Sequence, residues 1–360
     1  MTAGTANRLF SPAEPAEALE NIKQSLAEKR PIIPAGRFSR LGDWSRRPAF
    51  GADFVAAGNL NQIVEFNPDD LAIRIGAGAT PAELNQILEG TNLFWPVRGV
   101  HLENRSLGAI LNEGLSGDEV RRYGRMLDLL MGVEMITPDG RRIKTGGATV
   151  KNVSGYDLTR LCWRAAGTLG FVLNVTLKLT PNLETKCLAE VPLADPAVGA
   201  DLAEKIILGR LGAESLKIIH NQGWFLTVGL GDFREVVDLR KERLAAILKE
   251  AGLAYEIYDD PGYYSRPEMV LCSSRTESAR ARRRDLLNMV RSLAGRKDGD
   301  FYLEADITGE MARFRSLPDR FPGVVVDDVN SAGPVYRQLK NSLDPEDIFF
   351  PLPLMTKRPE

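Results

Sequence analysis

The segment spanning residues 151–181 constrains the fold of this chain more than any other. It contains a glycine turn, then an apolar-spaced stretch that predicts a helix, and then Gly167-Thr168-Leu169-Gly170. Residues 171–179 are rich in β-branched and apolar side chains and predict a buried strand. Two glycines at a helix-to-strand junction let backbone amides approach a ligand, although many helix C-termini have the same pattern. The two glycines alone therefore do not establish a ligand-binding site, and other segments of the sequence must support that interpretation.

The composition is typical of a globular protein. The chain has 360 residues, which predicts two domains or one large one. With 46 basic and 48 acidic residues, its net charge is −2, so nucleic acid and anionic membranes are not expected partners. The sequence contains no apolar run long enough for a transmembrane helix and no signal-peptide pattern, which predicts a cytoplasmic protein.

Cysteine and histidine are scarce. The cysteines are Cys162, Cys187 and Cys272, and the histidines are His101 and His220. The cysteines are far apart and lack metal-ligand spacing, which argues against disulfides, iron–sulfur clusters and zinc. We therefore predict no metal site.

The first 182 residues contain short strands, many turns and few long helices, which indicates an α+β fold. Thr80-Pro81-Ala82-Glu83 has the sequence of a capping box and predicts the start of a helix. The segment 96–117 reads as irregular and glycine-bearing. The remaining expected elements are helices at 11–29 and 158–166, and strands at 31–34, 54–56, 63–66, 71–78, 129–137 and 141–144.

The second half of the chain has longer amphipathic segments that alternate with strands, which predicts a second α+β domain. Helices are expected at 200–208, 233–250 and 277–294, and strands at 224–228 and 253–258. The C-terminal tail predicts a helix that ends at Asp344-Pro345 and continues as an extended apolar segment.

One motif suggests a different fold. Ile75-Gly76-Ala77-Gly78 resembles the start of a dinucleotide-binding GxGxxG motif. Pro81 stands where the third glycine would be, so we do not expect a nicotinamide Rossmann site.

Several motifs in a fixed order are similar to those of a known family. These are Leu115-Ser116-Gly117, Tyr123-Gly124, the run KNVSGYDLTRL at 151–161, the GTLG at 167–170, and the tail LKNSLDPEDIFFP at 339–351. Together they resemble FAD-binding proteins of the vanillyl-alcohol oxidase type, which carry the PCMH-type FAD-binding fold. The likeness is strongest to the FAD-binding subunit of glycolate oxidase.

The resemblance implies a fold and a cofactor. Residues 1–182 would form a PCMH-type domain of two subdomains that hold FAD, residues 183–329 an α+β cap, and residues 330–360 a segment that returns to the FAD domain. Covalent attachment in this family uses His or Cys. Neither occurs between Pro31 and Gly42, and only His101 lies in the second glycine region, so the resemblance implies non-covalent FAD.

The resemblance also implies which residues hold FAD, and they fall into four segments. Tyr123, Asn152 and Tyr156 could equally serve only turns and packing. The implied residues are Ala35, Gly36, Arg37, Phe38, Ser39 and Arg40; Ser106, Leu107, Gly108, Asn112, Gly114, Ser116, Gly117, Tyr123 and Gly124; Asn152, Gly155 and Tyr156; and Gly167, Thr168, Gly170 and Val172.

Two positions depart from the family pattern. Arg37 and Phe38 stand where the family has successive glycines, so their side chains could obstruct backbone contact with the phosphates. Arg37 could instead bind a phosphate through two hydrogen bonds. Ala109 replaces a further glycine, a change that adds only a methyl group.

The resemblance implies an accessory, electron-transferring subunit of a glycolate or lactate oxidase. Its partners would be a catalytic flavoprotein subunit and an iron–sulfur subunit, through which it could lie peripherally at a membrane. Family members that act on the hydroxyacid have a histidine-rich HxGDxNxH-type motif in the cap, whereas this cap has only His220. We therefore assign no catalytic residue. Two alternatives remain: a structural subunit without flavin, and a stand-alone hydroxyacid dehydrogenase.

Overall fold

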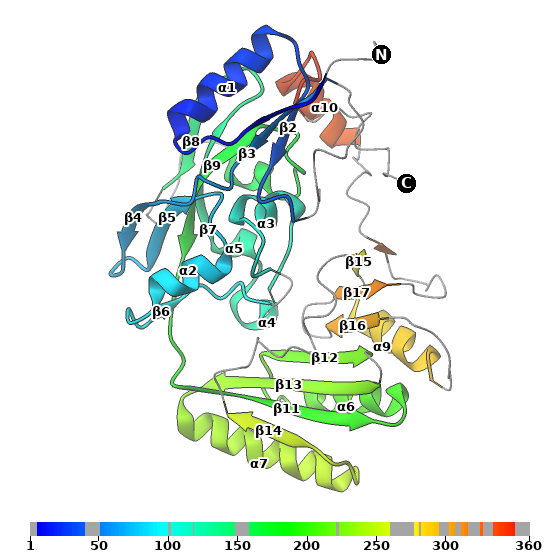
Figure 1. The fold of residues 1–360 in the computed structure, drawn as a ribbon. Coiled ribbons are helices and arrows are strands. Elements are labelled where there is room, and N and C mark those ends of the chain that lie inside the picture. The colour runs from blue at the N-terminus through cyan, green and yellow to red at the C-terminus, as the bar shows by residue number, and fades with distance from the viewer. Residues whose placement is uncertain are drawn as a thin grey trace.

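The computed structural model describes residues 6–39, 51–99, 102–117, 119–147, 158–220, 223–259, 277–280, 282–294, 302–306, 311–315, 325–326 and 334–349. These residues form two lobes, one above the other in Figure 1. The N-terminal lobe contains residues 6–181 and the C-terminal helix, and the second lobe contains residues 185–326. The chain passes between the lobes after Pro181.

The N-terminal lobe begins with a small parallel sheet in the order β1-β3-β2. Helix α1 (Pro15–Ala27) packs on it through Ala18 and Ile22, which are fully buried. The buried carboxylate of Asp53 accepts hydrogen bonds from Arg8, Arg30 and Ser25, which ties β1 and α1 to β3. The strands are β1 (Arg8–Phe10), β2 (Ile32–Ala35) and β3 (Asp53–Ala56).

A five-stranded antiparallel sheet in the order β4-β5-β9-β7-β8 forms the rest of this lobe. The segment predicted as a buried strand is β9, which lies at its centre, and seven of its eight residues are buried. Helix α3 packs on β9. The bounds are β4 (Ile63–Asn67), β5 (Ala72–Gly76), β7 (Leu130–Ile136), β8 (Arg142–Gly146), β9 (Phe171–Lys178), α2 (Pro81–Leu88), α3 (Leu107–Glu113), α4 (Val120–Tyr123) and α5 (Met126–Leu129), with a short pair of β6 (Leu93–Phe94) and β10 (Thr180–Pro181).

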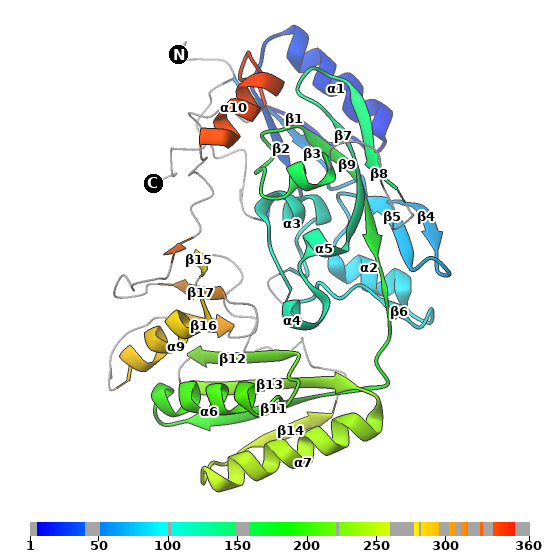
Figure 2. The same cartoon turned by 180° about the vertical axis from the view of Figure 1, so that it is seen from behind.

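The second lobe is an eight-stranded antiparallel sheet in the order β14-β11-β13-β12-β16-β17-β15-β18. Figure 2 shows α6 and α7 on one face of this sheet, and one buried cluster joins both helices and α9 to the strands. The bounds are β11 (Thr185–Leu193), β12 (Ser215–His220), β13 (Trp224–Asp232), β14 (Glu256–Asp259), β15 (Glu277–Arg280), β16 (Tyr302–Asp306), β17 (Met311–Arg315), β18 (Val325–Val326), α6 (Pro196–Leu208), α7 (Arg234–Glu250) and α9 (Arg283–Ser292).

The C-terminal segment lies against the N-terminal lobe, as Figure 1 shows. Helix α10 (Pro334–Leu343) is followed by Phe349, which forms a parallel bridge with Ile32. The Lys340 ammonium is buried, forms an ion pair with Asp344 and donates to the Phe349 carbonyl at 2.6 Å. Of the helices that the structure describes, none has the length and hydropathy needed to cross a membrane.

The structure confirms the α+β class and corrects three expected elements. Residues 107–113 form helix α3 rather than irregular chain, because Ser106 caps the helix and Leu107, Ile110 and Leu111 share a buried face. Residues 277–280 form strand β15 rather than the start of a helix, because β17 and β18 pair with them. The helix expected through residue 166 is only a 3-10 turn at Leu158–Cys162.

Candidate functional site

Three of the four predicted cofactor segments meet around helix α3. Gly36, after β2, lies so close to the helix that a Cβ atom there would be 2.1 Å from Ser106 Oγ. On the other side, the Gly167 amide donates to Asn112 Oδ1 at 3.0 Å. Gly167 also packs against Pro34 on β2. The structure therefore brings together segments that are about 70 and 60 residues apart in the sequence.

The first-turn amides of α3 are already occupied. Leu107 N donates to the Ala79 carbonyl at 2.8 Å, and Gly108 N donates to the Ala77 carbonyl at 2.8 Å. Ala109 N donates to Ser106 Oγ at 3.3 Å. The helix therefore fixes its position against the strand β5 region, and these three amides are bonded within the protein in this structure.

The loop 36–39 differs from α3 in this respect. Within the described part of the chain, no hydrogen bond starts from the backbone N–H of Arg37, Phe38 or Ser39. Phe38 adopts a left-handed conformation with a φ of 58°. Consecutive amides around a left-handed residue form a concave set of donors that suits an anion such as a phosphate. This loop is therefore the part of the predicted site best suited to bind a phosphate.

The side chains of Arg37 and Phe38 are both held by protein contacts. The Arg37 guanidinium donates to the Gly78 carbonyl at 2.9 Å and to both carboxylate oxygens of Glu83 at 2.6 and 2.8 Å. Phe38 packs on a small cluster that includes Ile33 and Phe54. In this structure Arg37 thus pairs with both oxygens of a carboxylate. The side chains of Arg37 and Phe38 are both accommodated, and the loop amides still donate to no acceptor among the described residues.

Most of the remaining predicted residues have a packing role in the structure. Gly114 ends α3 in a left-handed conformation, with the Arg164 side chain against it. Thr168 is buried and donates to the Ala165 carbonyl. Gly170 lies against the Ile136 carbonyl, where no side chain would fit. Backbone conformation and close packing are enough to explain glycine at positions 114 and 170. Contacts between these residues and a ligand stay a prediction.

Other predicted residues are spread more widely. Ala35, Leu107, Ser116 and Val172 are buried. Gly117 lies against the Arg98 backbone, and Tyr123 and Gly124 lie at the end of α4, beside the second lobe. Four predicted residues fall outside the residues that the structure describes: Arg40, Asn152, Gly155 and Tyr156.

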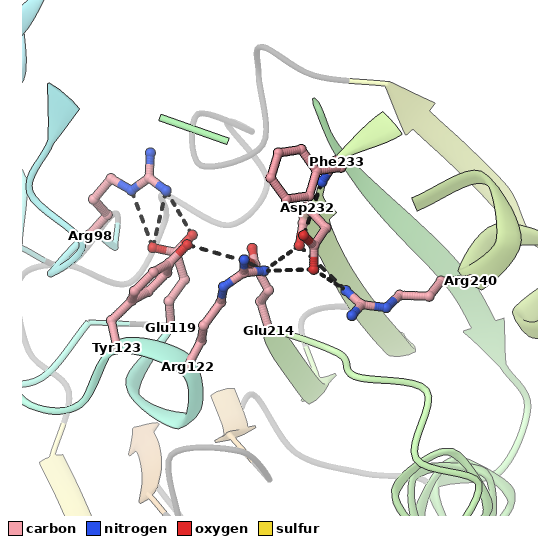
Figure 3. Close-up of polar contacts among 9 residues, drawn as sticks. Arg98, Glu119, Arg122, Tyr123, Glu214, Asp232, Phe233 and Arg240 are labelled. Carbon is pink, nitrogen blue, oxygen red and sulfur yellow. Dashed lines mark hydrogen bonds and ion pairs between the residues drawn. The ribbon is translucent and has the colours of Figure 1, made fainter. Parts of the chain in front are cut away.

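A second polar cluster joins the two lobes, and sequence reasoning did not find it. Figure 3 shows Arg122 on α4 reaching the second lobe, where it donates to Glu214 Oε1 at 2.6 Å and to the Gly231 carbonyl. Tyr123 OH lies 3.5 Å from the same Glu214 oxygen. Nearby, Arg98 holds the buried Glu119 through two nitrogens. We define Arg98, Glu119, Arg122, Tyr123 and Glu214 as the interlobe cluster.

Glu214 has an unusual environment within this cluster. Its side chain is 1% exposed, and its Oε2 atom is buried with no hydrogen-bond partner among the described residues. Burial, and then the neighbouring Glu119 charge, raise the pKa of Glu214 to about 7, although Arg122 acts in the opposite direction. Burial also raises the pKa of Tyr123 above its usual value. Glu214 can therefore gain or lose a proton near neutral pH.

An aromatic ring supports the cluster from the N-terminal lobe. The Phe94 ring contacts the edge of Tyr123, with centroids 5.6 Å apart. The Arg98 guanidinium lies 4.3 Å from the Phe94 centroid, and the Lys186 ammonium lies 4.8 Å from it. Cations over an aromatic ring are stabilised by its quadrupole, so this packing helps to concentrate positive charge between the lobes.

Comparison with known proteins finds similarity to FAD-binding domains and to a group of solved structures. Residues 6–158 match the model of the FAD binding domain family. The whole fold is similar to crystal structures of alkyldihydroxyacetonephosphate synthase, with a TM-score of 0.68, 15% identity, and 95% of this chain and 75% of that chain covered. At this level of identity, the similarity to these structures shows the fold alone.

Sequence comparison also identifies similar proteins. The chain is 33% identical over 156 residues to the glycolate oxidase subunit GlcD of Bacillus subtilis and 29% identical over 165 residues to the glycolate oxidase subunit GlcE of Escherichia coli. It is 30% identical over 158 residues to the D-2-hydroxyglutarate dehydrogenase of Stutzerimonas stutzeri. These matches cover 43%, 46% and 44% of this chain and 33%, 46% and 34% of the relatives. The chain therefore spans less than half the length of these curated relatives.

The residues present fit FAD. A pyrophosphate needs several free donors, and in the part of the chain that the structure describes the amides of residues 37–39 donate to no protein acceptor. Gly36 keeps this loop against Ser106, where a side chain would force it away. When bound, FAD would supply the redox chemistry, and the protein would supply its binding and orientation.

Proposed function

We propose that this chain binds FAD non-covalently and carries electrons as an accessory subunit of a glycolate or lactate oxidase or dehydrogenase. The single observation that carries the proposal is the loop 36–39, with its available amides in a domain of the FAD-binding family. The relatives named as glycolate oxidase subunits support the substrate class.

The described cysteines support a non-covalent cofactor. Cys162 and Cys187 are both buried. Burial raises the pKa of Cys162 to about 12 and that of Cys187 to about 11, so neither thiol is readily ionised at neutral pH. A thiolate is the nucleophilic form of cysteine, so these two residues are poor candidates for a bond to the flavin.

The proposed partners are a catalytic flavoprotein subunit and an iron–sulfur subunit. Electrons from the flavin need an acceptor, and the described cysteines are isolated in separate cores, Cys162 in the N-terminal lobe and Cys187 in the second lobe. We place this complex in the cytoplasm, with any contact to a membrane made through the partners.

This chain's own residues have two roles in the proposal. The amides of residues 37–39 bind the phosphates of FAD and fix its position. In the interlobe cluster, Glu214 holds a proton near neutral pH, beside Tyr123 and Arg122.

The test is the visible absorption spectrum of the purified full-length chain, followed by acid precipitation. Flavin absorbance that moves to the supernatant is the expected result. A colourless chain that takes up no added FAD would overturn the proposal and favour a structural subunit. Reduction of the flavin by glycolate or lactate without partners would instead identify a stand-alone dehydrogenase and contradict the accessory role.

A further inference from the structure

We propose that the Arg37–Glu83 ion pair is a positioning element that holds loop 36–39 in the shape that binds the FAD phosphates. In this role Arg37 does not touch the phosphate and acts through Glu83. The inference rests on the proposed function, because it assigns a role to two residues of the same site.

The first step is the geometry of the ion pair. Arg37 makes three hydrogen bonds, one to the Gly78 carbonyl and two to Glu83. The Nε atom donates to Gly78 and the Nη2 atom alone donates to both oxygens of Glu83, so two nitrogens of one planar group fix the orientation of the side chain. Because Arg37 belongs to the loop, its backbone is tied directly to the start of α2.

The second step is the rigidity of the partner. Glu83 also completes the capping box of α2: Thr80 N donates to Glu83 Oε2 at 2.9 Å, and Glu83 N donates to Thr80 Oγ1 at 3.2 Å. The carboxylate therefore cannot move without loss of a helix cap. Arg37 is anchored to a fixed point and not to a mobile surface side chain.

The third step is the need for an anchor. Phe38 has a left-handed backbone, a conformation that is strained for a residue other than glycine. Among the described residues, the amides of residues 37–39 donate to no acceptor, so no backbone hydrogen bond from these amides to the described part of the chain holds this conformation. The Arg37 bonds on one side and the Phe38 ring on the other supply the missing restraint.

The alternative is that Arg37 leaves Glu83 and binds the phosphate itself. The two roles make opposite predictions for Glu83. If Glu83 anchors Arg37, neutralising Glu83 weakens FAD binding. If Glu83 only competes with the phosphate for Arg37, neutralising it leaves FAD binding unchanged or tightens it.

The experiment measures the Kd for FAD and the melting temperature of the FAD-free chain in three variants. Glu83→Gln keeps the capping box, since Gln can also bond the cap backbone. Arg37→Ala removes the anchor from the other side, and the double variant removes both. Arg291→Ala is the control, because Arg291 is 32% exposed, against 31% for Arg37, and forms its ion pairs with Asp201 and Glu204 in the second lobe.

The expected result is a roughly tenfold weaker Kd for Glu83→Gln and for Arg37→Ala, because a loop that must be ordered on binding loses affinity. The double variant should be no weaker than Arg37→Ala, and the melting temperatures should change little. Arg291→Ala should leave the Kd unchanged.

Two results would overturn the inference. Unchanged or tighter FAD binding by Glu83→Gln, with weaker binding by Arg37→Ala, would show direct phosphate contact by Arg37. Equal Kd values for all variants would show that the pair has no role in binding. If the unmodified chain binds no FAD, the proposed function itself fails, and this outcome is distinct from the other two.

Discussion

Two arginine–glutamate ion pairs in this protein have similar contacts but different structural roles. Arg37 donates to Glu83 and to the Gly78 carbonyl, and Arg122 donates to Glu214 and to the Gly231 carbonyl. The first pair lies within the N-terminal lobe, whereas the second joins the two lobes. The same chemistry therefore fixes a loop in one place and a domain contact in the other.

The difference lies in burial. The arginines are about equally exposed, at 31% and 30%, but Glu83 is 36% exposed and Glu214 only 1%. An exposed pair contributes at most about 1 kcal/mol to stability. A buried carboxylate that loses its cation leaves a costly charge in the protein. The two ion pairs have the same N–O distance of 2.6 Å, but their loss would destabilise the protein by different amounts. The burial of the glutamate determines that difference.

The largest effect is expected for Arg122→Ala. Removing this cation should lower the free energy of unfolding by about 3 kcal/mol at pH 8, because the buried Glu214 would lose the charge that stabilises its ionised form and would either stay unpaired or take up a proton. Arg37→Ala should lower it by no more than about 1 kcal/mol. Chemical denaturation of both variants measures the difference, and equal losses would contradict the role given to burial.

The second prediction concerns Glu214→Gln and pH. Because the pKa of Glu214 is about 7 in the folded protein, against an ordinary value of 4.5, the unfolded chain releases this proton first. Stability from this residue is therefore present below pH 4.5 and is lost as the pH rises towards 7. Across that window the loss is about 3 kcal/mol at most.

The measurement for this prediction is the free energy of unfolding of both proteins from pH 4.5 to 8. The difference between the unmodified chain and Glu214→Gln should shift in favour of the variant as the pH rises. Glu83→Gln, measured in parallel, shows how much a glutamate-to-glutamine change alters stability at each pH when the glutamate is 36% exposed. A constant difference for Glu214→Gln would mean that the carboxyl is already ionised at low pH.

The third prediction concerns the contact between Gly36 in loop 36–39 and Ser106 at the start of helix α3. Gly36→Ala should destabilise the protein by about 1–2 kcal/mol, because the new methyl group would meet Ser106 Oγ and disturb the cap of α3. Adding Ser106→Ala should cost less than the sum of the two single changes, since the clashing oxygen is then absent. Strict additivity in thermal unfolding would show that the two residues do not touch.

The smallest effect is expected for Phe38→Gly. Glycine removes the strain of the left-handed backbone, worth about 1 kcal/mol, but loses the packing of a partly buried ring, worth a similar amount. The net change in unfolding free energy should be below about 1 kcal/mol. A loss of several kcal/mol would show that the ring, rather than the ion pair, holds the loop.

The sequence predicted much of the fold because local signals were clear. The capping box at Thr80 and Glu83 appeared as predicted, and so did the buried strand β9. The strand β15 was missed because its residues carry no strand signal of their own, and its conformation comes from pairing with β17 and β18. Helix α3 was missed although its capping serine and apolar spacing were visible.

For the site, the sequence by itself determined the glycine positions and the loop that departs from the family pattern. Only the tertiary structure decided where Arg37 points, because its partners Gly78 and Glu83 lie more than 40 residues away. The same is true of Glu214, which meets Arg122 across 92 residues of sequence. The type of charge on each side chain follows from the sequence. Burial and pairing depend on how distant segments pack, and they determine how much each ion pair contributes to stability.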